Sequence, residues 1–440
     1  METPIFDFVR RYAQKEPSRL HMPGHKGTGP LGCEQLDITE ISGADSLYEA
    51  QGVIAASEQN AAKLFCSGRT FYSAGGTSQC LKAMLCLVAG ASQGKTILAA
   101  RNAHKAFVHA AALLDLDVQW LWPEEYSLLR CHVTAAQLER RLAGSSRLPA
   151  AVYVTSPDYL GHMQPVDELA RVCHRYGVPL LVDNAHGAYL HFLPHPVHPL
   201  DLGADFCCDS AHKTLPVLTG GAYFHLAACQ SGIGDVAVRQ ALAMFGSTSP
   251  SYLILQSLDL CNASLAGEFP ARLAQTVERV DALKERLRHK GWRVEQSEPL
   301  KIVVRTDAGQ GTGRQLACEL RRHGAECEYA DAEHLVLMAS PYNKEQDFVR
   351  VEQAFSRAPS AGGARVSCGM LPPQRAMSIR QAMFSPWEEI EVEKAEGRVC
   401  AAPTVSCPPA VPVVVSGEVI RADAIRVMRH YGVCTVCVVQ

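Results

Sequence analysis

The sequence predicts an α/β fold built on a largely parallel β-sheet, followed by a smaller α+β unit. Short apolar runs alternate with longer helical stretches from about residue 59 to residue 227, which is the pattern of strand–helix–strand crossover units. A long amphipathic stretch comes next, and shorter, less regular runs follow it. A chain of 440 residues is long enough for two or three domains with a substantial buried core.

The apolar runs in the first part of the chain are short enough to be strands. They are Thr96–Ala100, Val118–Trp122, Ala150–Thr155, Pro179–Asp183, Asp205–Asp209 and Gly221–His225. Helices are expected between them, at Thr77–Val88, Lys105–Leu114, Ala135–Leu142 and Val166–Tyr176. Gly177 follows the last of these helices, in the position where a glycine commonly ends a helix.

A long helical region is predicted over Leu258–Lys290, because apolar residues from Leu273 to Leu287 recur at steps of three and four and Gly291 follows. Beyond it we expect strands at Leu300–Arg305 and Leu335–Leu337, helices near Gly313–Arg322 and Lys344–Phe355, a small-residue linker over 358–364 and a strand-like run at Val411–Val415. The predicted organisation is an N-terminal segment (1–58), a large domain (59–260), a linking helix with a small α+β domain (261–357) and a C-terminal segment (358–440).

Charge and hydropathy exclude several classes of protein. Lys and Arg together number 42 against 45 Asp and Glu, so the net charge of -3 gives no basic excess for nucleic acid or an anionic membrane. No stretch reaches the roughly 18 apolar residues of a membrane helix, and the first residues lack the apolar core of a signal peptide. A cytoplasmic protein is therefore expected, with no nucleic-acid or membrane partner.

The 17 cysteines are interpreted as reduced thiols. Most of them lie in apolar runs, as Cys207 and Cys208 do, where a thiol packs as a small apolar group. Cys434 and Cys437 have the spacing of half a zinc site, but no second pair follows at a suitable distance. No metal site is therefore predicted.

The dipeptide His-Lys occurs at residues 25–26, 104–105, 212–213 and 289–290, so its position must decide its meaning. Lys290 closes an amphipathic helix, where a cation complements the helix dipole. Lys213 differs, because it follows one buried strand and precedes another. It is therefore expected at the edge of the sheet where open α/β folds bind ligands.

Three further features are expected at the same edge. Asp183 ends the preceding strand and can pair with a protonated heteroaromatic nitrogen. The run from Ser73 to Ser78 leads into a helix whose first amides and hydroxyls can bind an anion, and His104 can stack on a planar ligand. Together with Lys213 these features indicate a pyridoxal 5′-phosphate (PLP) pocket, and four unrelated structural features are the alternative interpretation.

The chain resembles the ornithine/lysine/arginine decarboxylases, a family of PLP enzymes with the aspartate-aminotransferase-like fold. The resemblance covers nearly the whole chain, and the pairing of Asp-Asn-Ala-His-Gly at 183–187 with Ser-Ala-His-Lys-Thr at 210–214 is specific. The other matching segments are TPIFDFVRRYA, HMPGHKG, GADSLYEAQGVI, SAGGTSQ, RNAHKA, TSPDYLG, STSPSYL and GRVCAAPTVSCPPAVPVVVSGEVI. The family implies a large domain with a mainly parallel seven-stranded sheet and a smaller C-terminal α+β domain.

The resemblance also implies the roles of individual residues. Lys213 would be the Schiff-base lysine, Asp183 the partner of the pyridine nitrogen, and His104 the residue stacked on the ring. Lys213 or His212 would return a proton to the α-carbon, so Lys213, His212 and Asp183 form the implied catalytic set. The implied PLP contacts are Gly76, Thr77, Ser78, His104, Asp183, Ala185, His186, Ser210, His212, Lys213 and Thr248.

The implied reaction is the decarboxylation of lysine, arginine or ornithine to cadaverine, agmatine or putrescine. Transamination, side-chain cleavage and a homologue that binds PLP without turnover are the alternatives. An aminotransferase would clamp the substrate carboxylate with an arginine, for which Arg365 is the candidate. Asp45, Glu49 and Glu418 are candidates for the wall that faces the distal amine of a basic substrate.

The chain departs from the family pattern in three places, and a further motif concerns assembly. Gly76 lacks a hydroxyl, Tyr48 replaces a common histidine and Cys407 replaces a tyrosine before Pro-Pro, so the preferred substrate stays open. The turn from Ser247 to Tyr252 is similar to one that reaches the phosphate site of a neighbouring subunit in the family. A homodimer with shared active sites is therefore expected.

Overall fold

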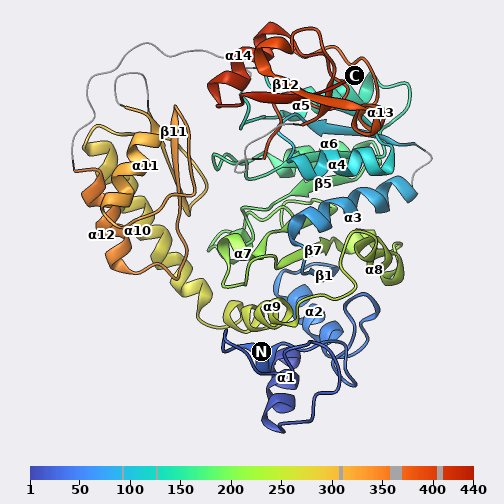
Figure 1. Cartoon of the computed structure of the whole chain (residues 1–440), viewed down its shortest axis with the longest axis vertical. Coiled ribbons are helices and arrows are strands. Elements are labelled where there is room, and N and C mark those ends of the chain that lie inside the picture. Colours follow the sequence, from blue (N-terminus) through green and yellow to red (C-terminus); the bar gives the residue numbers. More distant parts are fainter. Residues whose placement is uncertain (92–93, 125–126, 307–310, 357–368, 404–409) are drawn as a thin grey trace. The chain divides into compact units, whose positions relative to one another are not determined.

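The computed structural model describes the whole chain except residues 92–93, 125–126, 307–310, 357–368 and 404–409 (Figure 1). It contains a seven-stranded sheet with the order β1-β7-β6-β5-β4-β2-β3. The pairs β2/β3, β2/β4 and β5/β6 are parallel, and β7 is antiparallel to both β1 and β6. The predicted α/β class with a mainly parallel seven-stranded sheet is thus confirmed. The strands are β1 (Arg69–Ser73), β2 (Thr96–Ala100), β3 (Asp117–Leu121), β4 (Ala151–Thr155), β5 (Leu180–Asp183), β6 (Phe206–Asp209) and β7 (Ala222–Leu226).

By its internal contacts the chain divides into two compact units. The first unit consists of Met1–Gln93 and Val166–Arg272, and the second of Gly94–Pro165 and Leu273–Gln440. Strands β1, β5, β6 and β7 belong to the first unit, and β2, β3 and β4 belong to the second.

In the first unit, helix α3 (Gly76–Ala91) packs against β1, β5, β6 and β7, and α2 (Val53–Leu64) packs against β1. Helices α1 (Pro4–Gln14) and α9 (Tyr252–Leu265) pack on α2 and on each other. The unit also contains α6 (Val166–Arg175), α7 (Ala211–Thr214) and α8 (Asp235–Ala243). Gly177 follows α6 with φ of 65°, a left-handed conformation that favours glycine, as predicted.

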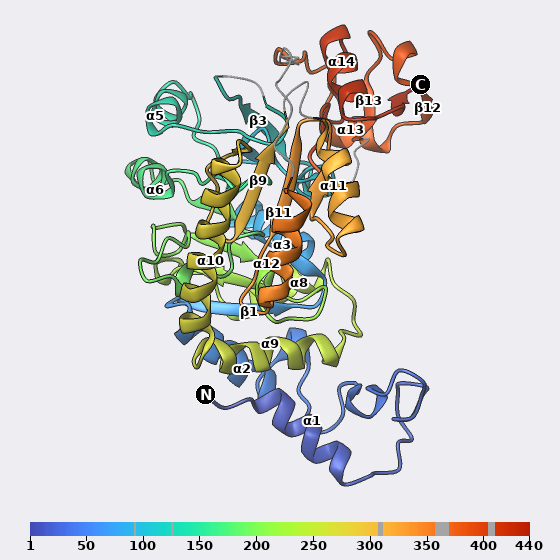
Figure 2. The ribbon, with the colours of Figure 1, turned by 90° about the vertical axis from the view of Figure 1, so that its left-hand side faces the viewer.

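In the second unit, α4 (Lys105–Leu114) and α5 (Ala135–Ala143) accompany strands β2, β3 and β4. A four-stranded antiparallel sheet has the order β10-β11-β9-β8, and its strands β9 and β11 are labelled in Figure 2. Its core joins residues of this sheet to residues of α10, α11 and α12, among them Leu283, Val304, Leu320 and Phe348. The elements are β8 (Arg293–Val294), β9 (Lys301–Arg305), β10 (Tyr329–Ala330), β11 (His334–Met338), α10 (Phe269–His289), α11 (Gly313–Arg322) and α12 (Glu345–Ala354).

The predicted helical region Leu258–Lys290 is corrected by the structure, because it is divided between α9 and α10. Pro270 explains the break. Proline has no amide hydrogen for the bond to the preceding turn, and it disfavours helical backbone in the residue before it, so it is tolerated only near a helix start. Pro270 is the second residue of α10.

The C-terminal residues form a third sheet, with the order β12-β14-β13. Its strands are β12 (Trp387–Glu391), β13 (Cys400–Ala402) and β14 (Thr435–Val439), and α13 (Ile379–Phe384) and α14 (Ala422–His430) accompany them. The strand-like run Val411–Val415 is buried but is not a strand. Instead, the carbonyl oxygens of Pro412 and Val413 accept hydrogen bonds from the Arg101 guanidinium. The predicted linker over 358–364 lies outside the described residues.

The cysteines that the structure describes are free thiols. Within the same described part of the chain, no helix is both long and apolar enough to cross a membrane.

Candidate active site

The site begins at the end of β6, a strand whose residues are all buried. Ser210 follows the strand, and the short helix α7 then carries His212 and Lys213 back toward β7. The Nζ atom of the half-buried Lys213 lies 3.1 Å from Nε2 of His186. The lysine predicted from its position after a buried strand therefore has an imidazole within hydrogen-bond distance.

His186 belongs to the turn that follows the neighbouring parallel strand, β5. Asp183 pairs with Cys208 in the sheet, so the ends of β5 and β6 lie side by side. The Asp183 side chain is buried, and its Oδ1 accepts a hydrogen bond of 3.2 Å from the amide of Ala185. The first unit thus brings Asp183, Ala185, His186 and Lys213 to neighbouring strand ends, and the roles inferred for them stay predictions.

The loop before α3 supplies the candidate anion site. Gly76 has φ of 68°, which favours glycine over a residue with a side chain and explains the missing hydroxyl at this position. Its amide donates to the carbonyl of Gly220 at 2.8 Å, which ties the loop to the segment that enters β7. Thr77 and Ser78 are half-buried in the first turn of α3, where the backbone amides have no acceptor inside the helix.

His212 is adjacent to Lys213 in sequence, but its ring is oriented by the backbone. Its Nδ1 lies 3.2 Å from the carbonyl oxygen of Gly221 and 3.3 Å from Oγ of the buried Ser210. Burial lowers the pKa of His212, and the nearby Lys213 charge lowers it further. The imidazole is therefore neutral near pH 7 and is held beside the first turn of α7.

For two of the predicted PLP contacts, the structure shows only the local surroundings. His104 belongs to the second unit, where its Nδ1 accepts a 3.1 Å hydrogen bond from the Ala106 amide and caps helix α4. Thr248 belongs to the first unit and is exposed. The roles inferred for both residues stay predictions.

The residues considered for substrate binding have other partners or lie elsewhere. Asp45 accepts hydrogen bonds from several amides between Ser46 and Ala55. Glu418 forms a buried ion pair of 3.1 Å with Arg101, so it is not an open wall for a substrate. Glu49 is exposed. Arg365 and Cys407 lie outside the described residues.

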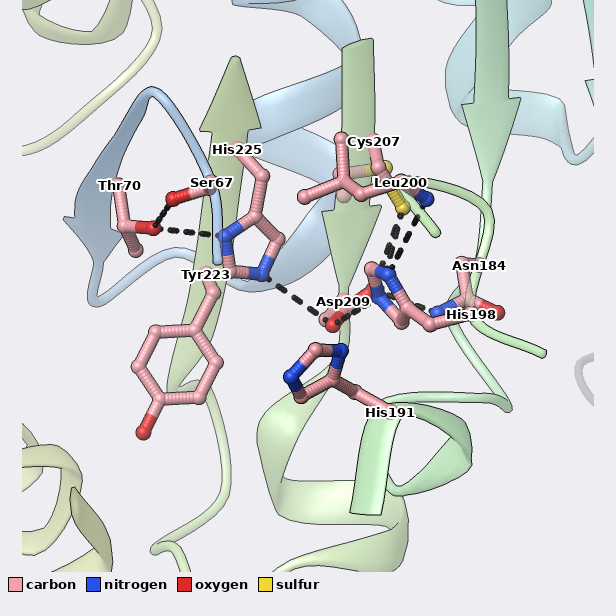
Figure 3. A network of polar contacts seen from close by, with 12 residues as sticks. Ser67, Thr70, Asn184, His191, His198, Leu200, Cys207, Asp209, Tyr223 and His225 are labelled. Atoms are coloured by element: carbon pink, nitrogen blue, oxygen red, sulfur yellow. Dashed lines mark hydrogen bonds and ion pairs between the residues drawn. The ribbon is translucent and has the colours of Figure 1, made fainter. Parts of the chain in front are cut away.

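Sequence reasoning missed two groups of residues around the site. Gln79 on α3 accepts from Ser73 and donates to the Tyr48 hydroxyl at 2.9 Å, so the unusual Tyr48 buttresses the anion loop. The second group surrounds Asp209, the last residue of β6, and consists of His198, His225 and Asn184 (Figure 3). A charged residue at the end of an otherwise apolar buried strand is the sequence signal that could have indicated Asp209.

These residues fit PLP. Buried polar atoms without a hydrogen-bond partner in the described structure occur at Asn184 Oδ1, in the segment that leads to His186, and at Thr214 Oγ1, in the residue after Lys213. The space next to Gly76 is open, since a Cβ atom there would meet nothing within 4 Å. A lysine amine, a buried carboxylate at a strand end and a helix N-terminus with two hydroxyls match the aldehyde, ring nitrogen and phosphate of this cofactor.

The fold is that of the lysine decarboxylases. The solved structure of the constitutive lysine decarboxylase of Escherichia coli matches 100% of this chain and 82% of its own, with a TM-score of 0.81 and 18% sequence identity. Models of the Orn/Lys/Arg decarboxylase family match residues 3–337 as the major domain and residues 368–435 as the C-terminal domain. The chain therefore belongs to the Orn/Lys/Arg decarboxylase family, and it is a carboxy-lyase.

Two curated relatives match over almost their full length. An arginine decarboxylase of Bacillus anthracis is 28% identical over 461 residues, which cover 97% of this chain and 92% of the relative. An uncharacterized protein of Bacillus subtilis, YaaO, is 29% identical over 457 residues, which cover 97% and 93%. The family resemblance inferred from the motifs is thus confirmed.

Proposed function

We propose that this protein is a PLP-dependent decarboxylase that converts lysine, arginine or ornithine to the corresponding amine and CO2. Membership of the decarboxylase family supports the reaction class. The observation that carries the proposal is the Lys213 amine 3.1 Å from His186, at the strand end next to Asp183.

Each part of PLP has a partner among the residues described above. The Lys213 amine would hold the aldehyde, Asp183 the ring nitrogen, and Thr77 and Ser78 with the first amides of α3 the phosphate. When bound, PLP supplies an electron sink for the pair that remains as CO2 leaves. Asp183 keeps a proton on the ring nitrogen, because a carboxylate favours the cationic form of its partner. His104 would stack on the ring, as the family resemblance implies.

His186 is the proposed proton partner of Lys213. An amine attacks a carbonyl carbon only in its neutral form, so Lys213 must give up a proton before it can react. Nε2 of His186 can take that proton over 3.1 Å and return it to Nζ when the lysine acts as an acid.

Two further parts of the proposal concern the protein as a whole. We propose a homodimer with shared sites, to which the exposed Thr248 would contribute across the interface. We also propose a cytoplasmic location, supported by the free thiols, and a product that enters polyamine metabolism. Cell fractionation tests the location.

The decisive experiment is a panel of amino acids, incubated with the protein and PLP and scored for CO2 and amine. Lysine, arginine and ornithine are the expected substrates, and the panel ranks them. Keto acid without CO2 would identify an aminotransferase instead. No product from any of the three basic amino acids would contradict the proposal.

The attachment residue has its own test. Borohydride should fix PLP to the wild-type chain at Lys213, and Lys213→Ala should carry no label. Lys290→Ala is the matched control, since Lys290 also follows a histidine but forms an ion pair with Glu352 at the end of α10. Peptide mapping by mass spectrometry locates the label, and a label on another lysine would contradict the assignment.

A further inference from the structure

A buried carboxylate lies directly before the segment that carries Lys213. Asp209 is the last residue of β6, and its side chain is 0% exposed. Its Oδ2 lies 2.9 Å from Nε2 of His198 and 3.2 Å from Nε2 of His225, and its Oδ1 accepts a 2.7 Å hydrogen bond from the Asn184 amide (Figure 3). The thiol of Cys207 lies 3.4 Å from the same Oδ1.

The backbone determines the proton position on His198. The amide of Leu200 donates to His198 Nδ1 at 3.3 Å, so that nitrogen has a lone pair and the proton is on Nε2. His198 then donates from Nε2 to Asp209. His198, Cys207 and Asp209 are close enough to surround a metal ion, but an ion at Nε2 would need the lone pair on that atom. The arrangement is therefore that of a hydrogen-bonded carboxylate.

The carboxylate is charged although it is buried. Burial acts to raise the pKa of Asp209, but His198 and His225 outweigh it and hold the pKa well below the usual range. Burial lowers the pKa of His225. The hydrogen-bond donors around Asp209 stabilise its negative charge.

Asp209 is connected to the turn that carries Asp183 and His186. Side chains alternate between the two sides of a strand, so Asp183 lies next to the Cys208 thiol while Asn184 reaches Asp209 on the other side. The backbone amide of Asn184 also donates to the backbone carbonyl of Cys208 at 3.0 Å. The turn is thereby attached to β6 by its backbone and by the Asn184 side chain.

We propose that Asp209 is a positioning residue, which holds the turn with Asp183 and His186 in place relative to Lys213 through its hydrogen bond with Asn184. This inference rests on the proposed function, because only PLP chemistry gives those three side chains a common role. Asp209 itself would touch neither PLP nor the substrate.

The test is PLP binding by the cofactor-free, full-length protein, followed by the change in absorbance. Asp209→Asn presents an NH2 group to donors that need an acceptor, so Asn184 should lose its fixed place. We expect the Kd for PLP to rise about tenfold or more, as when a hydrogen bond to a charged group is lost. The melting temperature is measured in parallel, because a purely structural role would lower it without changing the Kd.

Asp205→Asn is the matched control. Asp205 is also buried, and it joins the other ends of the same strands by accepting from the Leu180 amide at 2.8 Å and by pairing with His174 at 3.0 Å. This variant should lower the melting temperature and leave the Kd for PLP unchanged. Equal increases in Kd for Asp205→Asn and Asp209→Asn would overturn the inference, because the effect would then be general.

Asn184→Ala removes the other partner of the hydrogen bond between Asp209 and Asn184. This variant tests the inference even if Asp209→Asn does not fold. It should weaken PLP binding to a similar degree, and the double variant should be no weaker than the weaker single variant. Normal PLP binding by Asn184→Ala would overturn the inference and leave the proposed function intact. A wild-type protein that binds no PLP would overturn both.

Discussion

Two histidines lie near Lys213, and their side chains have different partners. His186 directs Nε2 at the Lys213 amine, at 3.1 Å. His212 instead has Nδ1 within 3.2 Å of the Gly221 carbonyl oxygen, and its lowered pKa keeps it neutral. The geometry therefore supports His186 as the acid–base partner of the lysine and His212 as a residue that shapes the α7 turn.

Substitution distinguishes these two roles. His186→Gln should lower kcat by about 100-fold to 10,000-fold, because that is the usual contribution of a positioned acid or base, with a smaller change in KM. His212→Gln should lower kcat less. Steady-state kinetics with the best substrate of the panel measure both variants, and a larger loss of kcat in His212→Gln would reverse the assignment.

Single residues differ in how far the sequence reveals them. Lys213 and Asp183 are predictable, because each ends or follows a buried apolar run and parallel strand ends meet at one edge. The partner of Glu418 is not predictable from the sequence. Arg101, which pairs with it, is more than 300 residues away, and no pattern near either residue indicates the ion pair. The sequence therefore suggests Glu418 as a substrate-binding residue, whereas in the structure its carboxylate is buried in an ion pair.

At the level of elements, one buried ion pair joins the C-terminal segment to β2. Arg101 follows β2, pairs with Glu418 at 3.1 Å and lies over the rings of Trp120 and Trp122. Arg101→Met should destabilise the protein by about 3–5 kcal/mol, because it leaves the Glu418 carboxylate buried without its cation. Thermal or urea unfolding measures the loss.

Two companion variants test this explanation. Replacing both ions, as Arg101→Met with Glu418→Met, should restore a large part of the lost stability, since no unpaired charge then remains. Arg375→Ala removes an ion pair with Asp117 that is about half exposed, and it should cost about 1 kcal/mol or less. Equal losses for Arg101→Met and Arg375→Ala would contradict the burial argument.

A second element contact depends on pH. Asp259 on α9 accepts hydrogen bonds of 2.9 Å from the Ile5 and Phe6 amides, so it caps the first turn of α1 from another helix. Burial raises its pKa from 3.8 to about 6. A raised carboxylate pKa means that the folded protein binds the proton more tightly, so the associated stability is present at low pH and is lost as pH rises to 6.

Asp259→Asn imitates the protonated state at every pH and should remove this dependence. Between pH 5 and pH 6, the wild type should lose about 1 kcal/mol of unfolding free energy relative to the variant, because the folded protein releases only part of the proton over that interval. Above pH 7 the difference should be constant. Unfolding curves at each pH measure it, and parallel profiles for the two proteins would show that Asp259 titrates normally.

The elements themselves were mostly predictable, and the exceptions have physical reasons. Strand β2 and helices α4 and α11 match their predicted bounds, because clear apolar periodicity lies between turn residues. Strand β1 was not among the predicted ranges. It begins with Arg69 and is antiparallel to β7 at the edge of the sheet, so it has no strand–helix–strand pattern around it.

At the level of the whole molecule, large apolar side chains stand exposed on the N-terminal segment. Leu20 is 96% and Leu31 is 82% exposed, and Met22 is also largely uncovered. Large exposed apolar side chains are common where a protein contacts a partner. They support the proposed homodimer, with a second copy of the chain as the partner.

Shared active sites make a quantitative prediction for mixed dimers. Lys213→Ala removes the proposed attachment site, and Thr248→Asp should repel the phosphate that Thr248 is proposed to bind in the other subunit. Each homodimer should be inactive. A mixed dimer would restore one complete site, because the intact Lys213 of one subunit meets the intact Thr248 of the other. Random mixing makes half of all dimers mixed, and one of the two sites in each mixed dimer is complete. About a quarter of wild-type activity should therefore return.

The mixing is done by unfolding and refolding the two variants together, and the activity is compared with that of each variant refolded alone. Wild-type chains treated in the same way give the reference value, and light scattering confirms the dimer. If each site were complete within one subunit, every subunit in a mixed dimer would still carry one defect, and no activity would return. Full activity in a monomeric wild-type protein would contradict shared sites directly.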